Sequence, residues 1–141
     1  MAADERFRSG RLDCGQVKVL TDTHTLVWAL SKPEALGSEA RAALAESPFT
    51  ASVANFWELV LKKGKTGALI TDPLPWWEKY VIRTGIPVLA IRSDHIRALA
   101  TLPELHKDPF DRILVAQSLA EGVRLATKDV LLTRYGVPVV W

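Results

Sequence analysis

The sequence contains a single cysteine, Cys14, among its 141 residues. One cysteine excludes an intramolecular disulfide and any metal site built from several cysteines, and it is typical of a reducing compartment. No apolar run approaches the ~18 residues that a membrane span requires. Residues 1–16 carry charges but lack the hydrophobic segment of a signal peptide. We therefore expect a cytoplasmic protein with no membrane partner.

A strong net charge is also missing. Eighteen lysines and arginines against 16 aspartates and glutamates leave a formal net charge of +2. This excess is too small for a whole-molecule field that collects nucleic acid, so any polyanionic partner has to be held by local patches. With 48% hydrophobic and 24% charged residues, the chain is expected to fold as one globular domain.

Several catalytic signatures are absent from the sequence. There is no G-x-S-x-G nucleophile elbow, no P-loop and no G-x-G-x-x-G segment. The histidines His24, His95 and His106 are each isolated and lack the spacing that zinc sites use, which disfavours zinc. A receiver domain needs paired acids after its first strand, and a dehalogenase-type phosphatase needs an acid at position 24. The segment Asp22-Thr23-His24 provides neither.

Strand and helix patterns alternate along the chain after residue 16. Short apolar and β-branched runs predict strands at 17–21, 49–53, 87–91, 123–127 and 137–140. Helices are expected at 23–30, 38–46, 55–65, 75–84, 93–102 and 108–121, with a helix or turn at 128–135. Because parallel strands need crossover connections, this alternation predicts an α/β fold with a largely parallel sheet and helices on both faces.

Capping residues define several of the predicted helix ends. Ser38 and Asn55 are expected to cap the starts of two helices. Asp108 followed by Pro109 has the form of a third helix start, and Gly122 is expected to end that helix. We interpret residues 1–16 as a flexible extension and 17–141 as the folded domain.

Acidic residues follow or flank the predicted strands. Asp22 directly follows the first, Glu58 lies in the first turns after the second, Asp111 opens the helix before the fourth, and Asp129 comes two residues after the fourth. Ligands of parallel sheets bind at the carboxyl ends of the strands, so we expect these acids to converge there. Converging carboxylates repel one another unless a cation neutralises them, and oxygen ligands suit Mg²⁺ or Mn²⁺. This layout is typical of a metal-dependent phosphodiesterase.

Each of these acids has a structural alternative. Asp22 and Asp129 can cap helices without any chemistry, and Asp111 forms an ordinary capping pair with Asp108. Glu58 differs, because its apolar neighbours leave little solvent face and a buried carboxylate is costly without a partner. The joint placement of the acids therefore argues for a site more strongly than any one of them.

Tryptophans and cations offer further candidate contacts. The lysines at 62, 63 and 65 suit the end of a helix, whereas Arg112 beside Asp111 and Lys128 beside Asp129 are better placed for phosphate. A tryptophan stacks on bases or is buried by a partner protein, although most are core residues. The five tryptophans are Trp28, Trp57, Trp76, Trp77 and Trp141, of which the Trp76-Trp77 pair is the strongest interface candidate.

Four segments of the sequence carry a family resemblance. They are Leu20-Thr21-Asp22-Thr23-His24 with Trp28, Phe56-Trp57-Glu58-Leu59, His106-Lys107-Asp108-Pro109-Phe110-Asp111-Arg112, and Thr127-Lys128-Asp129. Together they resemble the PIN-domain ribonucleases, specifically the VapC-type toxins of toxin-antitoxin pairs. The match spans about residues 17–141. Two features depart from the family pattern: residues 1–16 precede the usual start, and Asn55 stands where serine is common.

The resemblance implies a three-layer α/β/α fold with a five-stranded, mainly parallel sheet. It also implies a catalytic and metal-binding quartet that holds Mg²⁺ or Mn²⁺, and supporting residues around that quartet. The implied quartet is Asp22, Glu58, Asp111 and Asp129, and the supporting candidates are Asp108, Ser52 and Arg112.

The implied activity is metal-dependent endoribonuclease cleavage of RNA phosphodiester bonds, with tRNA or another structured RNA as candidate substrates. The implied partners are a cognate antitoxin and a second copy of the chain in a homodimer. Trp28, Trp57 and the Trp76-Trp77 pair are the predicted partner surface. The alternative is a catalytically weak PIN-like module that binds RNA or protein.

Overall fold

The computed structural model describes residues 19–141, and five short strands within it form one sheet. The strands are β1 (Val19–Thr21), β2 (Phe49–Ser52), β3 (Val88–Leu89), β4 (Arg124–Ala126) and β5 (Val139–Val140). They lie in the order β3-β2-β1-β4-β5, and every neighbouring pair is parallel. The predicted five-stranded parallel sheet is therefore confirmed. The proposed extension 1–16 and the start of the first predicted strand lie outside the described residues.

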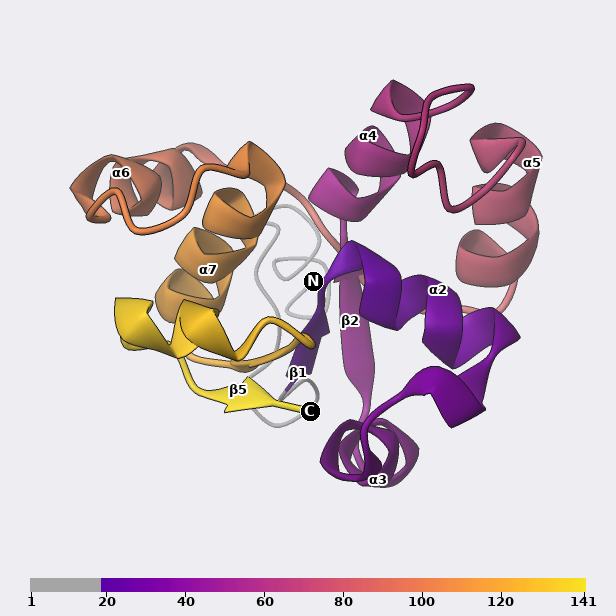
Figure 1. The fold of residues 1–141 in the computed structure, drawn as a ribbon, viewed down its shortest axis with the longest axis horizontal. Helices are drawn as coiled ribbons and strands as arrows, with labels where there is room; N and C mark the ends of the chain where they lie inside the picture. Colours follow the sequence, from indigo (N-terminus) through magenta and orange to yellow (C-terminus); the bar gives the residue numbers. More distant parts are fainter. Residues whose placement is uncertain (1–18) are drawn as a thin grey trace, which may run out of the picture.

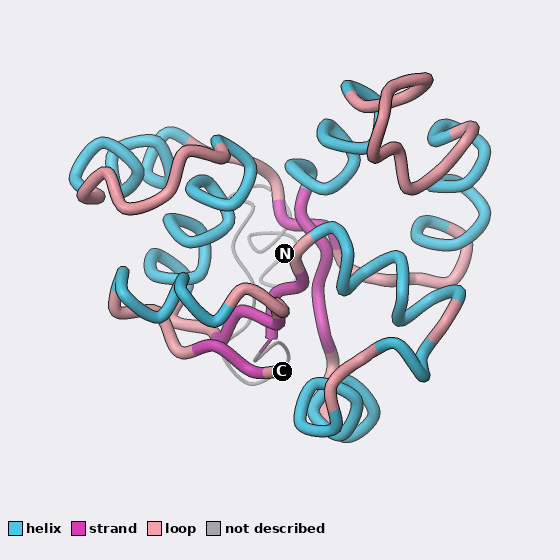
Figure 2. The backbone as a smooth tube through the Cα atoms, in the orientation of Figure 1, coloured by secondary structure: helices cyan, strands magenta, loops and turns pink. Residues whose placement is uncertain are grey.

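Helices connect the strands and cover both sides of the sheet (Figures 1 and 2). The α-helices are α2 (Thr23–Ser31), α3 (Ser38–Glu46), α4 (Val53–Leu61), α5 (Pro73–Trp77), α6 (Ser93–Thr101) and α7 (Pro109–Glu121). Two short 3₁₀ helices, η1 (Pro33–Ala35) and η3 (Val130–Tyr135), and a π-helix, η2 (Glu78–Ile82), complete the set within 19–141. None of these helices is both long and apolar enough to cross a membrane.

The core has apolar clusters on opposite faces of the sheet. Successive strand residues point to opposite faces, so short apolar strands bury side chains on both. Leu20 and Leu125 pack with Leu114 of α7 on one face, and Ala51 packs with Leu26 of α2 on the other. Figure 1 shows α6 and α7 on one side of the sheet and α2 and α5 on the other. The predicted three-layer arrangement is confirmed.

The chain reverses its direction of travel across the sheet at β1. From β1 it continues to β2 and β3 on one side, and it later returns to β4 and β5 on the other side of β1. The backbone N–H of Asp22 donates to the carbonyl of Ala126 at 3.1 Å, so the ends of β1 and β4 lie together. Such a switch point is where open parallel sheets form a crevice for ligands.

The predicted bounds of α3 and α7 are confirmed, whereas two predicted caps are wrong. Gly37, and not Ser38, is the N-cap of α3. A Cβ atom at Gly37 would lie 2.6 Å from the backbone carbonyl carbon of Trp141, so the packing of the C-terminal residue favours glycine there. The α7 helix ends as predicted at Gly122, which has a φ of 70°.

The cap of α4 also differs from the prediction. Ser52, and not Asn55, is its N-cap, and the Ser52 hydroxyl accepts a hydrogen bond from the N–H of Ala54 at 3.0 Å. Asn55 occupies the third helical position, where its Oδ1 accepts a hydrogen bond from the N–H of Ser52 at 2.8 Å. The two residues form a capping box, which leaves the Asn55 amide nitrogen available for other contacts.

Candidate active site

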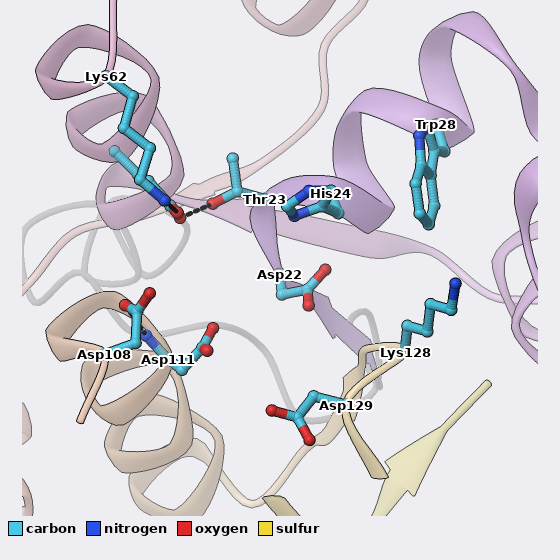
Figure 3. Close-up of a pocket in the computed structure, with 10 residues that line it drawn as sticks. Asp22, Thr23, His24, Trp28, Lys62, Asp108, Asp111, Lys128 and Asp129 are labelled. Atoms are coloured by element: carbon cyan, nitrogen blue, oxygen red, sulfur yellow. Dashed lines mark hydrogen bonds and ion pairs between the residues drawn. The ribbon is translucent and has the colours of Figure 1, made fainter. Parts of the chain in front are cut away.

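A cavity of about 340 Å³ lies at the carboxyl ends of β1 and β4 (Figure 3). Its walls come from α2, α4, the start of α7 and the connection between β4 and η3. The lining residues are Asp22, Thr23, His24, Trp28, Glu58, Lys62, Asp108, Asp111, Lys128 and Asp129. The four predicted quartet residues therefore lie in one cavity, together with Asp108.

Asp22 is the N-cap of α2 and also a wall of the cavity. Its Oδ1 accepts a hydrogen bond from the N–H of Thr25 at 2.9 Å, and its Oδ2 accepts one from the hydroxyl of Thr127 at 2.6 Å. Burial raises the pKa of Asp22, and the hydrogen bonds from Thr127 and Thr25 offset only part of that rise. The structural and functional interpretations of Asp22 are therefore compatible.

Glu58 is buried and has two partners. Its Oε1 accepts a hydrogen bond from the Thr23 hydroxyl at 2.5 Å, and its Oε2 pairs with the ammonium of Lys62 at 2.6 Å. Asn55 donates to the Thr23 hydroxyl at 3.2 Å and so holds that hydroxyl in place. Lys62 is therefore the ion-pair partner of Glu58, whereas Lys63 forms a separate ion pair with Asp72 at 3.6 Å.

Asp111 lies among other carboxylates at the start of α7, and its pKa is raised. Burial and the negative charges of Asp108, Asp22 and Glu58 raise the pKa of Asp111 to about 7, against the opposing effect of His106. Asp108 caps α7 by accepting hydrogen bonds from the N–H groups of Phe110 at 2.8 Å and Asp111 at 3.2 Å. The cap therefore places two carboxylates side by side.

Asp129 lies close to Asp111 through a shared contact with His106. The Nε2 atom of His106 lies 3.0 Å from Oδ2 of Asp129 and 3.5 Å from Oδ2 of Asp111. Its Nδ1 accepts a hydrogen bond from the N–H of Asp108 at 3.1 Å. In the neutral ring the proton is therefore on Nε2, which donates towards the two carboxylates. Asp129 also caps η3 by accepting from the N–H of Leu131 at 3.1 Å.

The description of His106 as isolated is wrong, because the loop before α7 brings it to acids that are distant in sequence. His106, Asp111 and Asp129 place their ligand atoms within 4.8 Å of one another. The position of His106 two residues before Asp108 was the available signal. Thr23 and Thr127 also contact site acids, and each lies inside one of the four motif segments, which is the sequence signal for them.

The donor set of the cavity fits a divalent cation that prefers oxygen. Five carboxylates line it, and two of them have raised pKa values: burial raises the pKa of Asp22, and burial together with the neighbouring carboxylates raises that of Asp111. Mg²⁺ and Mn²⁺ bind carboxylate oxygens and keep several waters, so they do not require every acid to contact them. The lining residues are therefore suited to such an ion.

A second cluster of acids and histidine lies outside the cavity. Nε2 of His95 is 2.9 Å from Oε2 of Glu121, and the Asp94 carboxylate is near both. The guanidinium of Arg92 donates to Asp94 at 2.8 Å and to Glu121 at 2.6 Å. Because the Arg92 guanidinium pairs with both carboxylates and His95 contacts Glu121, this cluster is an ion-pair network between α6 and α7.

Two predicted supporting residues do not line the cavity. The buried hydroxyl of Ser52 donates to Oε1 of Gln117 at 2.6 Å, which joins the start of α4 to α7. The guanidinium of Arg112 donates to the carbonyl of Leu102 at 3.4 Å. Both side chains point into packing contacts. The geometry therefore does not favour a direct contact of Ser52 or Arg112 with a substrate. Ser52 contributes by fixing the start of the helix that carries Glu58.

The tryptophans have different environments from one another. Trp77 is 5% exposed and stacks on Phe56 at 4.7 Å, so the predicted Trp76-Trp77 pair does not form one exposed surface. Trp57 is 53% exposed and packs edge-on against Phe110. Trp28 lines the cavity itself. Of the predicted partner surface, Trp57 is therefore exposed, Trp28 and Trp76 are half-buried, and Trp77 is buried.

Known structures share this fold at low sequence identity. The FitAcB complex of Neisseria gonorrhoeae aligns with a TM-score of 0.62 and 17% identity over 86% of this chain and 95% of that one. VapBC2 of Rickettsia felis, bound to a DNA fragment from its promoter, aligns with a TM-score of 0.58 and 12% sequence identity over 88% of this chain and 97% of that one. A toxin-antitoxin complex from Klebsiella pneumoniae aligns with a TM-score of 0.54 and 20% sequence identity over 87% of this chain and 96% of that one.

The family is established by sequence as well as by fold. Comparison with curated proteins gave no significant match. The sequence profile of the PIN domain, however, matches residues 19–137, which is most of the chain and includes every acid of the cavity. With its parallel sheet and its acids at the switch point, this chain belongs to the PIN-domain family.

Proposed function

We propose that this protein is a metal-dependent endoribonuclease that acts as the toxin of a VapC-type toxin-antitoxin pair. The observation that carries the proposal is the convergence of five carboxylates on one cavity at the switch point of the sheet. Membership of the PIN-domain family supports a nuclease. The fold that this chain shares with VapBC2 of Rickettsia felis and with a toxin-antitoxin complex from Klebsiella pneumoniae supports the biological role.

Asp22, Glu58, Asp111 and Asp129 are the residues that would hold Mg²⁺ or Mn²⁺. When bound, the ion would supply a water nucleophile at neutral pH and stabilise the negative charge that develops on the phosphate. A carboxylate set of this kind also needs neighbours that hold each oxygen in a productive orientation, because metal sites depend on such second contacts.

The chain provides these orienting contacts. The Thr127 hydroxyl donates to Asp22, the Thr23 hydroxyl donates to Glu58, and Nε2 of His106 donates towards Asp129 and Asp111. Each donor is fixed in turn. The Thr127 hydroxyl accepts a hydrogen bond from the N–H of Asp129, the Thr23 hydroxyl accepts one from the Asn55 amide, and Nδ1 of His106 accepts one from the N–H of Asp108. The acids are thereby held before a substrate arrives, which reduces the reorganisation that the reaction requires.

The proposal includes an antitoxin that covers the cavity. The outer face of α4 beside it exposes apolar side chains at Val53, Trp57, Val60 and Leu61, whose spacing places them on one side of the helix. Exposed apolar patches of this kind mark protein contacts. An antitoxin segment that packs on this face and extends a basic side chain into the acidic cavity would match it in both hydrophobicity and charge.

The remaining partners are proposals of the same kind. A structured RNA such as tRNA is the candidate substrate, and cleavage of purified cellular RNA followed by sequencing of the new ends would identify it. A homodimer is the expected oligomer, and sedimentation equilibrium of the purified chain would test it.

RNA cleavage by the purified protein tests the proposed activity. We expect cleavage with Mn²⁺ or Mg²⁺, none with EDTA, and none by Asp22→Asn although its circular dichroism spectrum and melting are those of a folded protein. Retained activity in Asp22→Asn would contradict the assignment of the site. Binding of RNA by the wild-type protein without cleavage in any divalent ion would favour the alternative, a catalytically weak binding module.

A further inference from the structure

We propose that His24, Trp28 and Lys128 form a nucleotide-binding subsite beside the acidic cluster, in which Trp28 stacks on a base of single-stranded RNA and Lys128 contacts a neighbouring phosphate. The inference rests on the proposed nuclease function and adds to it the type of RNA that the cavity accepts. It is carried by three side chains that line the same cavity as the acids but bring a different chemistry.

The three side chains come together from two elements. His24 and Trp28 are on successive turns of α2, with ring centroids 5.5 Å apart and planes inclined by 66°. The ammonium of Lys128, which follows β4, lies 6.0 Å from the centroid of the Trp28 ring. Figure 3 shows Trp28 and Lys128 on one side of Asp22, and Asp108 and Asp111 on the other.

The charge on this wall differs from that of the rest of the cavity. The other lining side chains with charge are the five carboxylates and Lys62, whose ammonium is paired with Glu58. Lys128 forms no ion pair with any residue in the described range 19–141. Its ammonium is therefore available to a phosphate, which would be bound beside the acids.

The Trp28 ring has a second aromatic neighbour, Trp141. The ring of Trp141 lies 5.9 Å from it at an angle of 53°, and Trp141 is itself packed against Gly37. An indole held between two neighbouring elements loses little freedom when a base stacks on it. A cavity of about 340 Å³ is also within the range of ~300–1,000 Å³ that is usual for small-ligand sites.

These features favour single-stranded RNA over a duplex. Aromatic side chains stack on any base, but only on a base that is not already stacked in a helix. Bases in loops and ends meet that condition, whereas the bases of an A-form helix do not. The subsite therefore selects an unpaired nucleotide next to the scissile phosphate, whichever structured RNA carries it.

Cleavage of short RNAs that each carry one abasic residue tests the subsite. With wild-type protein and Mn²⁺, we expect one abasic position next to the cut to lower kcat/KM by roughly 5- to 150-fold, the range of one base–aromatic stack. Trp28→Leu is expected to lower kcat/KM on intact RNA by a similar factor and to show no further loss at that abasic position. Trp28→Phe, which can still stack, should keep most of the activity.

The controls separate stacking from folding and from metal binding. Trp76→Leu removes a partly buried tryptophan that packs near Tyr80, and it should leave the abasic profile unchanged. Trp28→Leu should bind Mn²⁺ in a calorimeter as the wild type does. Lys128→Met should weaken cleavage equally at all abasic positions and reduce its dependence on salt, as expected for a phosphate contact.

The outcomes distinguish the subsite from the function on which it rests. If wild-type protein cleaves RNA and Trp28→Leu retains the same abasic profile, the subsite is overturned and the nuclease proposal stands. If Trp28→Leu does not fold, the wild type and Lys128→Met decide the matter. A wild-type abasic profile with no sensitive position next to the cut, or an unchanged salt dependence in Lys128→Met, would overturn the subsite. One sensitive position next to the cut together with a reduced salt dependence in Lys128→Met would support it. If the wild type cleaves no RNA, both proposals fail.

Discussion

The hydroxyl of Thr127 donates a hydrogen bond of 2.6 Å to Oδ2 of Asp22, across 105 positions in the sequence. The hydroxyl oxygen of Thr127 also accepts a hydrogen bond from the backbone N–H of Asp129 at 3.1 Å. One buried threonine therefore sets the positions of two acids that end neighbouring strands. This contact joins the residues that follow β1 and β4 at the switch point of the sheet, where the cavity lies.

Replacement of Thr127 by valine should disrupt the site while preserving its volume. Thr127→Val removes the donor to Asp22 and the acceptor for the Asp129 N–H, so unfolding free energy should fall by about 1–3 kcal/mol. Mn²⁺ affinity should fall about 10- to 100-fold, as is usual when a residue that orients a metal ligand is lost. Thr127→Ser, which keeps the hydroxyl, should restore most of the affinity. Equal Mn²⁺ binding by the valine and serine variants would show that the hydroxyl has no such role.

The stability of the metal-free protein should fall as the pH rises from about 5 to 7.5. In the folded state the pKa of Asp111 is raised to about 7, whereas an unfolded aspartate titrates near ~3.9. In this interval the folded protein binds more protons than the unfolded chain, so its free energy of unfolding decreases with pH. The raised pKa of Asp22 acts in the same direction. Urea unfolding in EDTA at several pH values measures the effect.

Asp111→Asn is the control for this pH dependence. The variant lacks the group that titrates near pH 7, so its unfolding free energy should change less over the same range. Saturating Mn²⁺ should also flatten the wild-type curve, because a bound cation favours the ionised carboxylates. A wild-type curve in EDTA that rises between pH 5 and 7.5 would contradict the assigned shift.

Substitutions of Asp108 should separate its capping role from its charge. Asp108→Ala removes the acceptor for the first two N–H groups of α7 and should lower stability by about 1 kcal/mol. Asp108→Asn keeps an acceptor but removes the charge, so stability should be near that of the wild type. The pKa of Asp111 should then fall, because the charge of Asp108 is one cause of its rise. NMR titration of the Asp111 carboxyl carbon measures this shift, and an unchanged pKa in Asp108→Asn would contradict the coupling.

Replacement of His106 should weaken metal binding through Asp111 and Asp129. His106→Ala removes the donor that lies 3.0 Å from Asp129 and 3.5 Å from Asp111, and we expect Mn²⁺ affinity to fall about 10- to 100-fold. His106→Gln supplies an N–H at a similar reach and should recover part of that loss. Calorimetric titration with Mn²⁺ measures both. If His106→Ala bound Mn²⁺ as tightly as the wild type, His106 would have no positioning role.

Sequence patterns predicted those elements whose ends carry their own signals. The Asp108-Pro109 pair and Gly122 mark both ends of α7, because a capping acid, a fixed φ and a left-handed glycine each act locally. The caps of α3 and α4 were misplaced because they depend on contacts made in the folded chain. Gly37 lies under Trp141, and Ser52 is fixed by Gln117, 65 positions away.

The candidate site was predicted from its acids but not from the residues that hold them. Asp22 and Asp129 follow strands, and the topology of a parallel sheet brings strand ends together whatever the intervening sequence. The pairing of Glu58 with Lys62 and the contact of His106 with Asp129 depend on side-chain directions that periodicity does not encode. The binding of a metal by each of these acids stays a prediction.

The central claim is that the carboxylates of the cavity bind the divalent ion on which RNA hydrolysis depends. Calorimetric titration of Mn²⁺ into the wild-type protein and into Asp22→Asn tests it most directly. We expect a saturable binding isotherm for the wild type, and for a folded Asp22→Asn either no binding or a marked loss of affinity. Identical isotherms for the two proteins, or no Mn²⁺ binding by a wild-type sample that cleaves RNA in EDTA, would contradict it.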